Sequence, residues 1–261
     1  MTDPTVAVRG TQGFPKAPWL GLTLVLLGIG AVFTAYRVYQ HATAFTVGMD
    51  YFAPEFQTYW MSLFYAQLPL LTVIGAAIIG RLWLTRDRNV MQISRREELK
   101  RYFVLLSCLL TFGVVAYLVA SIYTEADAAW HQVTVRDTDF TPTHITLFYF
   151  GIPCFIITAL TAFTYAHTRL PQFANRVSLP FALLVAGPVM IMPNLGFNEW
   201  GHTFFYAEEL FAAPIHWGFV LLGWSAFAAG GLVVQLLSRM TELTRVVADE
   251  TSPIAGANAA A

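Results

Sequence analysis

Charged residues are scarce in this chain of 261 residues. Asp, Glu, Lys and Arg together make up only 12% of it, whereas about a quarter of a soluble domain is usually charged. Hydrophobic residues make up 56%, and the mean hydropathy is +0.56. A separate water-soluble domain is therefore not expected, and neither is a nucleic-acid partner.

Cysteine is also scarce, with only Cys108 and Cys154 present. The two residues lie in different apolar runs, which indicates neither a disulfide framework nor a metal site made of paired thiolates. A metal bound by this chain would therefore be held by nitrogen and oxygen atoms.

Six apolar runs contain no charged residue at all, and each is long enough to cross about 30 Å of hydrocarbon as a helix. They cover residues 17–36, 57–80, 102–123, 145–166, 177–197 and 217–238. The sequence thus predicts an all-α, polytopic membrane helix bundle with about six transmembrane helices. Residues 1–245 are interpreted as a single transmembrane domain, and residues 246–261, which are small and polar, as a disordered tail.

Basic residues are nearly absent from one of the two sides that six helices would define. Of the 15 Lys and Arg residues only Arg37 and Arg136 fall on that side, which leaves 13 on the other. Because short basic loops stay in the cytoplasm, both termini are predicted to be cytoplasmic. In the basic connection, Ser94 and Glu97 have the spacing of a capping box that opens the third helix.

The outer side, by contrast, carries five of the six histidines, and two segments there repeat one pattern. In DAAWH, Asp127 and His131 are four residues apart and would share one face of a helix, and His144 follows at the start of the next helix. One carboxylate and two imidazoles leave coordination positions open on a metal, as dioxygen chemistry requires.

The second segment, NEWGH, places Asn198 and His202 at the same spacing, and His216 follows at the start of the sixth helix. An amide replaces the carboxylate, so this site would hold its metal less tightly or in another oxidation state. A single histidine at a helix end is more often a hydrogen-bonded interfacial residue than a ligand. The repetition of the pattern is what favours two metal sites here.

The two remaining histidines and the aromatic residues at the outer helix ends are not assigned to a metal site. His41 and His167 lack a companion ligand at helical spacing and are not assigned to a site. Several aromatic residues at the outer ends of the helices, Tyr123 and Trp130 among them, are expected to form a belt at the level of the lipid headgroups.

The segments around both patterns resemble a known family. The stretch 127–144, DAAWHQVTVRDTDFTPTH, and the stretch 187–224, GPVMIMPNLGFNEWGHTFFYAEELFAAPIHWGFVLLGW, are similar to the C subunit of the copper membrane monooxygenases. This family includes particulate methane monooxygenase, ammonia monooxygenase and short-alkane relatives. FAPEFQTYWM and LTRDRN are similar too, and the resemblance covers most of residues 49–237.

The resemblance implies one or two copper ions in this subunit, and oxygen insertion into a small substrate with electrons from a quinol. Zinc is an expected substitute, because nitrogen and oxygen ligands suit several divalent ions. The implied partners are membrane lipid and the subunits A and B, in a trimer of heterotrimers. The implied location is a bacterial inner membrane, cytoplasmic or intracytoplasmic, with the metal sites near the extracytoplasmic face. The copper ligands would be Asp127, His131 and His144 at one site and Asn198, His202 and His216 at the other.

One departure from the family pattern bears on the substrate. Methane-oxidising members commonly read HIIEFY after the third ligand, whereas this chain reads HITLFY, with Leu147 in place of the acid. The resemblance therefore favours short alkanes or alkenes, with methane or ammonia as the alternative. Two other classes stay open, a non-catalytic scaffold and a metal-transport subunit. Transport predicts ionisable residues along the helix interiors, and the cores of the six runs contain none.

Overall fold

The computed structural model describes residues 13–133, 140–189 and 208–251, and every regular element in these ranges is a helix. For residues 124, 128, 131–133, 208–222 and 251 it describes only the backbone. Four stretches are long and apolar enough to cross a membrane, which confirms the prediction of a polytopic helical bundle. The part of the fifth predicted run that is described contains a shorter helix, Leu179–Val189, and the sixth lies within the 44-residue helix α10 (Glu208–Thr251).

Several of the long stretches change helix type along their length. The elements, in chain order before Leu179, are α1 (Trp19–Val47), α2 (Pro54–Phe56), the π-helix η1 (Gln57–Met61), α3 (Ser62–Leu84), the 3-10 helix η2 (Val90–Gln92), α4 (Arg95–Leu118), the π-helix η3 (Val119–Thr124), α5 (Glu125–Val133), α6 (Pro142–Thr146), the π-helix η4 (Leu147–Gly151), α7 (Ile152–Arg169) and α8 (Pro171–Ala174). Three of the four membrane-crossing stretches therefore contain a π-helical segment.

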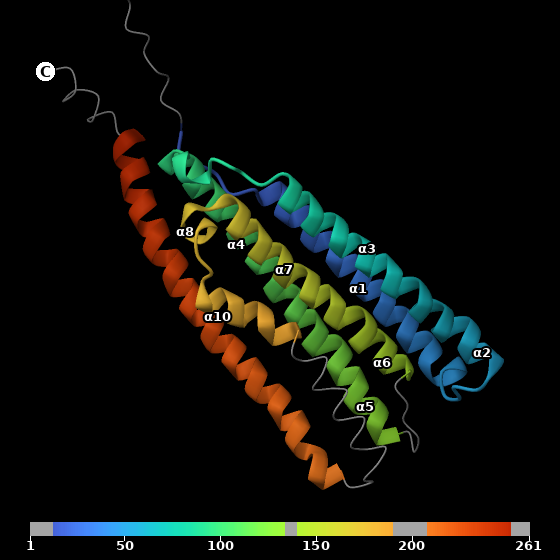
Figure 1. Ribbon diagram of the computed structural model, residues 1–261. Coiled ribbons are helices and arrows are strands. Elements are labelled where there is room, and N and C mark those ends of the chain that lie inside the picture. Colours follow the sequence, from blue (N-terminus) through green and yellow to red (C-terminus); the bar gives the residue numbers. More distant parts are fainter. Residues whose placement is uncertain (1–12, 134–139, 190–207, 252–261) are drawn as a thin grey trace, which may run out of the picture.

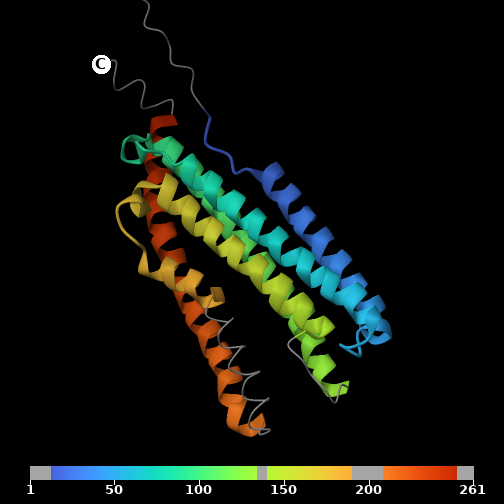
Figure 2. The same cartoon turned by 45° about the vertical axis from the view of Figure 1, so that its right-hand side comes forward.

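The helices α4 and α7 form the centre of the bundle, as Figures 1 and 2 show. They pack against each other, α3 lies against α7, and α1 and α10 both lie against α4. The largest buried apolar cluster joins α4, α7, the helix Leu179–Val189 and α10, through residues such as Leu105, Ala162, Phe181 and Leu232. Apolar side chains remain exposed along α1 and α3, as expected of helices that face lipid.

Basic residues gather at one end of the bundle, which we call the basic end. There α3 ends, α4 begins and α7 ends, with Arg86, Arg95, Lys100, Arg101 and Arg169 close to these termini. Helix α4 opens as predicted, because the Ser94 hydroxyl accepts a hydrogen bond from the backbone N–H of Glu97 at 3.2 Å. The opposite end, formed by α2, α5 and α6, is called the site end (Figure 1).

A buried ion pair attaches α10 to α4. The Glu98 side chain is only 2% exposed and accepts two hydrogen bonds from Arg239, from Nε at 2.8 Å and from Nη2 at 2.7 Å. Beyond this pair, Leu243 and Val247 are buried against the bundle, so α10 continues to Thr251. The helix thus extends past residue 246, where the sequence had suggested the start of a disordered tail.

Removing one partner of this pair is expected to destabilise the protein more than removing both. In the Arg239→Met variant the Glu98 carboxylate stays buried without its main partner, which typically costs about 3 kcal/mol or more. The double variant Glu98→Met/Arg239→Met replaces the pair by apolar side chains and should recover most of that loss. Thermal unfolding in detergent measures both, with Arg245→Met, an exposed arginine of the same helix, as the matched control. Equal unfolding midpoints for the single and double variants would contradict this account.

Candidate metal centre

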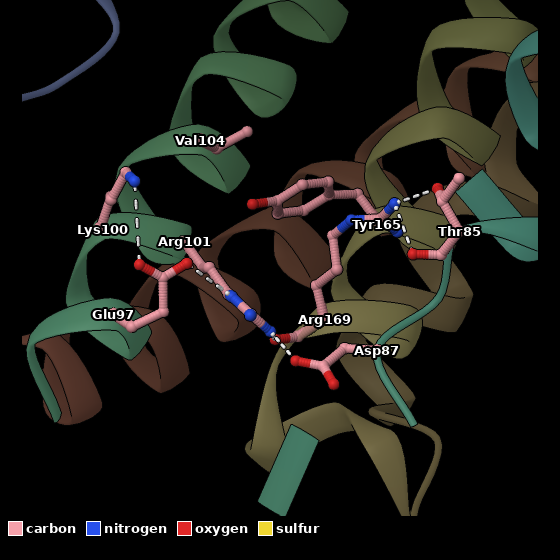
Figure 3. Close-up of a pocket in the computed structure, with 8 residues that line it drawn as sticks. All are labelled: Thr85, Asp87, Glu97, Lys100, Arg101, Val104, Tyr165 and Arg169. Carbon is pink, nitrogen blue, oxygen red and sulfur yellow. Dashed lines mark hydrogen bonds and ion pairs between the residues drawn. The ribbon is translucent and has the colours of Figure 1, made fainter. Parts of the chain in front are cut away.

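A polar cleft lies at the basic end of the bundle. Its volume is about 430 Å³, and Figure 3 shows the residues that line it, Thr85, Asp87, Glu97, Lys100, Arg101, Val104, Tyr165 and Arg169. Arg101 donates to Asp87 at 2.7 Å and to Glu97 at 3.1 Å, and the hydrogen bond from Arg101 lowers the pKa of the Asp87 carboxyl from its usual value. Arg169 donates to the hydroxyl of Thr85 at 2.7 Å. The charged groups of the cleft are therefore already bound to one another and to neighbouring residues. We interpret them as contacts that hold the α3–α4 connection against α7.

The site end brings together two of the residues predicted to bind a metal. The Nε2 atom of His144 lies 3.4 Å from the Oδ1 atom of Asp127. His144 lies on α6 and its side chain is 1% exposed, while Asp127 lies on α5 and its side chain is 15% exposed. His131, the third predicted ligand of this group, lies on α5 one turn after Asp127, and its side chain is outside the described residues.

Both helices that carry these residues adjoin a π-helical segment. The segment η3 leads directly into α5, η4 directly follows α6, and the two segments contact each other. A π turn holds about one residue more than an α turn, so each segment rotates the flanking side chains by roughly 100° relative to an unbroken α-helix. These turns therefore help to set the directions in which Asp127 and His144 point, and nothing in the sequence had indicated them.

The start of α6 is fixed by a cap and by a close contact with α1. The hydroxyl of Thr141 accepts a hydrogen bond from the backbone N–H of His144 at 3.1 Å, and Pro142 occupies the first turn, where its missing N–H does no harm. Gly48, just after α1, lies so near that a Cβ atom on it would be 2.5 Å from Cγ of Pro142. Only glycine allows α1 and α6 to approach so closely at this point.

Aromatic side chains surround the pair and keep the region apolar. The His144 ring stacks on Phe148 with ring centres 4.7 Å apart, and Trp130, Ile145 and Trp60 belong to one buried cluster beside it. The expectation that Tyr123 and Trp130 face the lipid headgroups is wrong, because they are 0% and 2% exposed. Tyr123 is held inside by a hydrogen bond from its hydroxyl to the carbonyl of Phe33 at 3.0 Å.

The geometry of the pair fits two ligands of one metal ion. Two donor atoms about 2.0 to 2.1 Å from an ion, at a tetrahedral angle, are about 3.3 to 3.4 Å apart. The observed 3.4 Å agrees with this spacing and is long for an ordinary hydrogen bond. A carboxylate oxygen and an imidazole nitrogen also suit copper and other first-row divalent metals.

The side chains of the predicted ligands of the second site lie outside the described residues. Asn198 and His202 are not among the described residues, and His216 lies on α10 with only its backbone described. Among the described side chains no group of three His, Cys, Asp or Glu residues could hold a metal, so the three-ligand sets stay predictions. His41 is exposed on α1, and His167, near the end of α7, binds the carbonyl of Phe163 through Nδ1 at 2.8 Å.

The interior of the described bundle offers no chain of ionisable groups for ion transport. Among the described residues, Glu98 and His144 are the only buried ones of the types Asp, Glu, His, Lys and Arg, and they lie on α4 at the basic end and on α6 at the site end. Glu98 is neutralised by Arg239. The described residues therefore do not show the row of ionisable groups through the membrane that the metal-transport alternative predicts.

The chain matches the model of a known protein family over most of its length. Residues 7–247 match the family model AmoC, which describes the C subunit of ammonia monooxygenase/methane monooxygenase. No curated protein matches the chain closely. The match covers almost the whole sequence, including α5, α6 and most of α10, and it agrees with the multi-pass helical bundle. The chain belongs to the C-subunit family of the ammonia and methane monooxygenases.

Proposed function

We propose that this chain is the copper-binding membrane subunit of a monooxygenase that inserts one oxygen atom of dioxygen into a small substrate, leaning to short-chain hydrocarbons. The observation that carries the proposal is the pair formed by Asp127 and His144, buried among aromatic side chains at the site end. Family membership supports association with the other monooxygenase subunits. The site end would face the extracytoplasmic side of a bacterial inner membrane, because the basic end carries the residues that remain in the cytoplasm.

The residues of the pair would hold copper, with His131 as a third ligand and Asn198, His202 and His216 at a second site. When bound, copper supplies the activation of dioxygen, with electrons from a quinol. The chain's own part is to fix the imidazole of His144 between α5 and the ring of Phe148 and to exclude water from it. Exclusion of water protects a reactive site from side reactions.

Loss of either described ligand should remove copper from the assembled enzyme. In the Asp127→Ala and His144→Ala variants the copper dissociation constant should rise by more than about 100-fold, since even loss of a group behind a ligand weakens metal binding by about 10- to 100-fold. Turnover should fall with copper content. His202→Ala tests the second site in the same way. Metal analysis of the purified complex and a turnover assay measure both quantities.

The exposed histidine of α1 provides the matched control for these variants. His41→Ala removes an imidazole outside the site and should leave copper content and turnover as in the wild type. Wild-type copper content and turnover in Asp127→Ala, His144→Ala and His202→Ala would leave only the scaffold interpretation. Zinc in place of copper after preparation would be displaced on copper loading, with recovery of turnover.

The surroundings of Leu147 support the proposed preference for short-chain hydrocarbon substrates. This side chain is 5% exposed and belongs to a buried apolar cluster with Phe33, Val115 and Phe155. It follows His144 by three residues and begins the π-helical segment η4. If Leu147 borders the substrate, an apolar residue there in place of a carboxylate would favour substrates with more CH2 groups, each worth about 0.8 kcal/mol or roughly fourfold in affinity.

Substrate competition assays of the assembled enzyme test this assignment. The wild type should have kcat/KM values that rise about fourfold per CH2 group from methane to propane, with ammonia lowest. Leu147→Glu should flatten this series, because a buried carboxyl makes this position polar, whereas Leu147→Met should preserve it. A wild-type enzyme that prefers ammonia or methane to ethane and propane would overturn the hydrocarbon assignment and leave the copper assignment intact.

A further inference from the structure

We propose that Gln40 and Gln67 are positioning residues for His144. Gln67 binds the backbone carbonyl of the residue that follows His144, and Gln40 binds the hydroxyl of Thr146, which in turn binds the backbone carbonyl of the residue before His144. The proposal rests on the proposed copper site and extends it to residues of α1 and α3. Both side chains lie in membrane-crossing helices and are buried, at 1% and 6% exposed.

The carboxamide of Gln67 binds the residue that follows His144. Its Nε2 atom donates a hydrogen bond to the backbone carbonyl of Ile145 at 3.0 Å, over a sequence separation of 78 residues. Its Oε1 atom accepts one from the hydroxyl of Tyr36 at 2.6 Å. Because both ends of the amide are engaged, the side chain of Gln67 is locked between α1 and α6.

The carboxamide of Gln40 binds the next residue of the same segment. Its Nε2 atom donates to the hydroxyl of Thr146 at 2.8 Å, and its Oε1 atom accepts from Nη1 of Arg37 at 2.7 Å. The hydroxyl of Thr146 in turn donates to the carbonyl of Thr143 at 2.9 Å. The bonds from α1 and α3 therefore reach the residues before and after His144.

Apolar side chains could pack α1 and α3 against α6 without placing amides in the membrane interior. A buried amide is unfavourable unless its hydrogen bonds are made, and even then it stabilises a bundle only modestly. Hydrogen bonds, however, are directional and fix rotation about the helix axis, which apolar packing leaves less strictly defined. The arrangement is therefore better suited to orienting a side chain than to holding the bundle together.

The segment that needs such orientation is short. Helix α6 forms the first five residues of the continuous stretch Pro142–Arg169, and the π-helical segment η4 separates it from the regular helix α7. A π-helical segment changes the rotation of the residues before it relative to those after it, so contacts with α1 and α3 help to fix the rotation of α6. The two carboxamides supply this from one side, while the cap at Thr141 and the contact at Gly48 fix where the helix begins.

The test compares copper binding in four variants of the assembled complex. Gln67→Leu removes the bond to Ile145, Thr146→Val removes the acceptor used by Gln40, and Tyr36→Phe removes the donor to Gln67. Gln67→Glu is the conservative variant, since a protonated carboxyl in this apolar region can still donate to Ile145. Copper dissociation constants are measured by competition with a chelator, and the copper environment by electron paramagnetic resonance.

The first three variants should raise the copper dissociation constant about tenfold and change the copper hyperfine splitting, because the imidazole of His144 loses its fixed orientation. Gln67→Glu should restore values near the wild type. Thr72→Val is the matched control, because Thr72 is exposed on α3 and its hydroxyl bonds only the carbonyl of Leu68 in its own helix, at 2.8 Å. It should bind copper like the wild type.

Wild-type affinity and hyperfine splitting in Gln67→Leu, Thr146→Val and Tyr36→Phe would overturn the proposal. If the Gln67→Leu complex does not assemble, Thr146→Val and Tyr36→Phe test the proposal by the same criterion, because each variant removes only one hydroxyl group. The His144→Ala variant separates the positioning role from the copper site itself. Copper loss in that variant together with unchanged binding in the others refutes only the positioning role, whereas no copper loss refutes the site and this inference with it.

Discussion

Polar groups inside a membrane-spanning bundle must find their hydrogen-bond partners within the protein, and this constraint governs where they occur in the chain. At the basic end the buried carboxylate of Glu98 is matched by Arg239. At the site end His144 lies against Asp127, and the carboxamides of Gln40 and Gln67 bind the backbone and hydroxyls behind it. Between these ends the described core is made of apolar side chains, which keep the two polar regions apart.

The site end differs from the rest of the bundle in the irregularity of its helices. The π-helical segments η1, η3 and η4 all occur toward this end, and the ligand-bearing helices α5 and α6 are short. Irregular backbone at membrane depth is tolerated when it is buried in protein. Here it turns Asp127 and His144 toward each other while the regular parts of α4 and α7 supply a rigid base. A member of this monooxygenase family thus combines a stable bundle with a locally adapted ligand region.

Much of this architecture could be predicted from the sequence, because hydropathy marks membrane helices directly. The cap at Ser94 and the placement of Asp127 and His131 on one helix could also be predicted, since both depend on residues close together in the chain. The first helix was predicted to end at residue 36, yet α1 continues to Val47. Arg37 ends the apolar run but not the helix, because Arg and Gln are both good helix formers.

The roles of Gln40 and Gln67 could not be predicted, because their partners are 106 and 78 residues away and a single glutamine in an apolar run does not reveal its face. The buried positions of Tyr123 and Trp130 were missed for a related reason, since an aromatic residue at a helix end suits both a lipid interface and a protein interior. The π turns left no signal either, as they arise from packing between helices rather than from local residue preference.

In the proposed site, Asp127 and His144 hold one copper ion between α5 and α6. Diffraction from the assembled enzyme on either side of the copper absorption edge tests it most directly. The account predicts an anomalous peak about 2.0 to 2.2 Å from Nε2 of His144 and from a carboxylate oxygen of Asp127. A copper-loaded, active enzyme with no anomalous peak between these two side chains would contradict it.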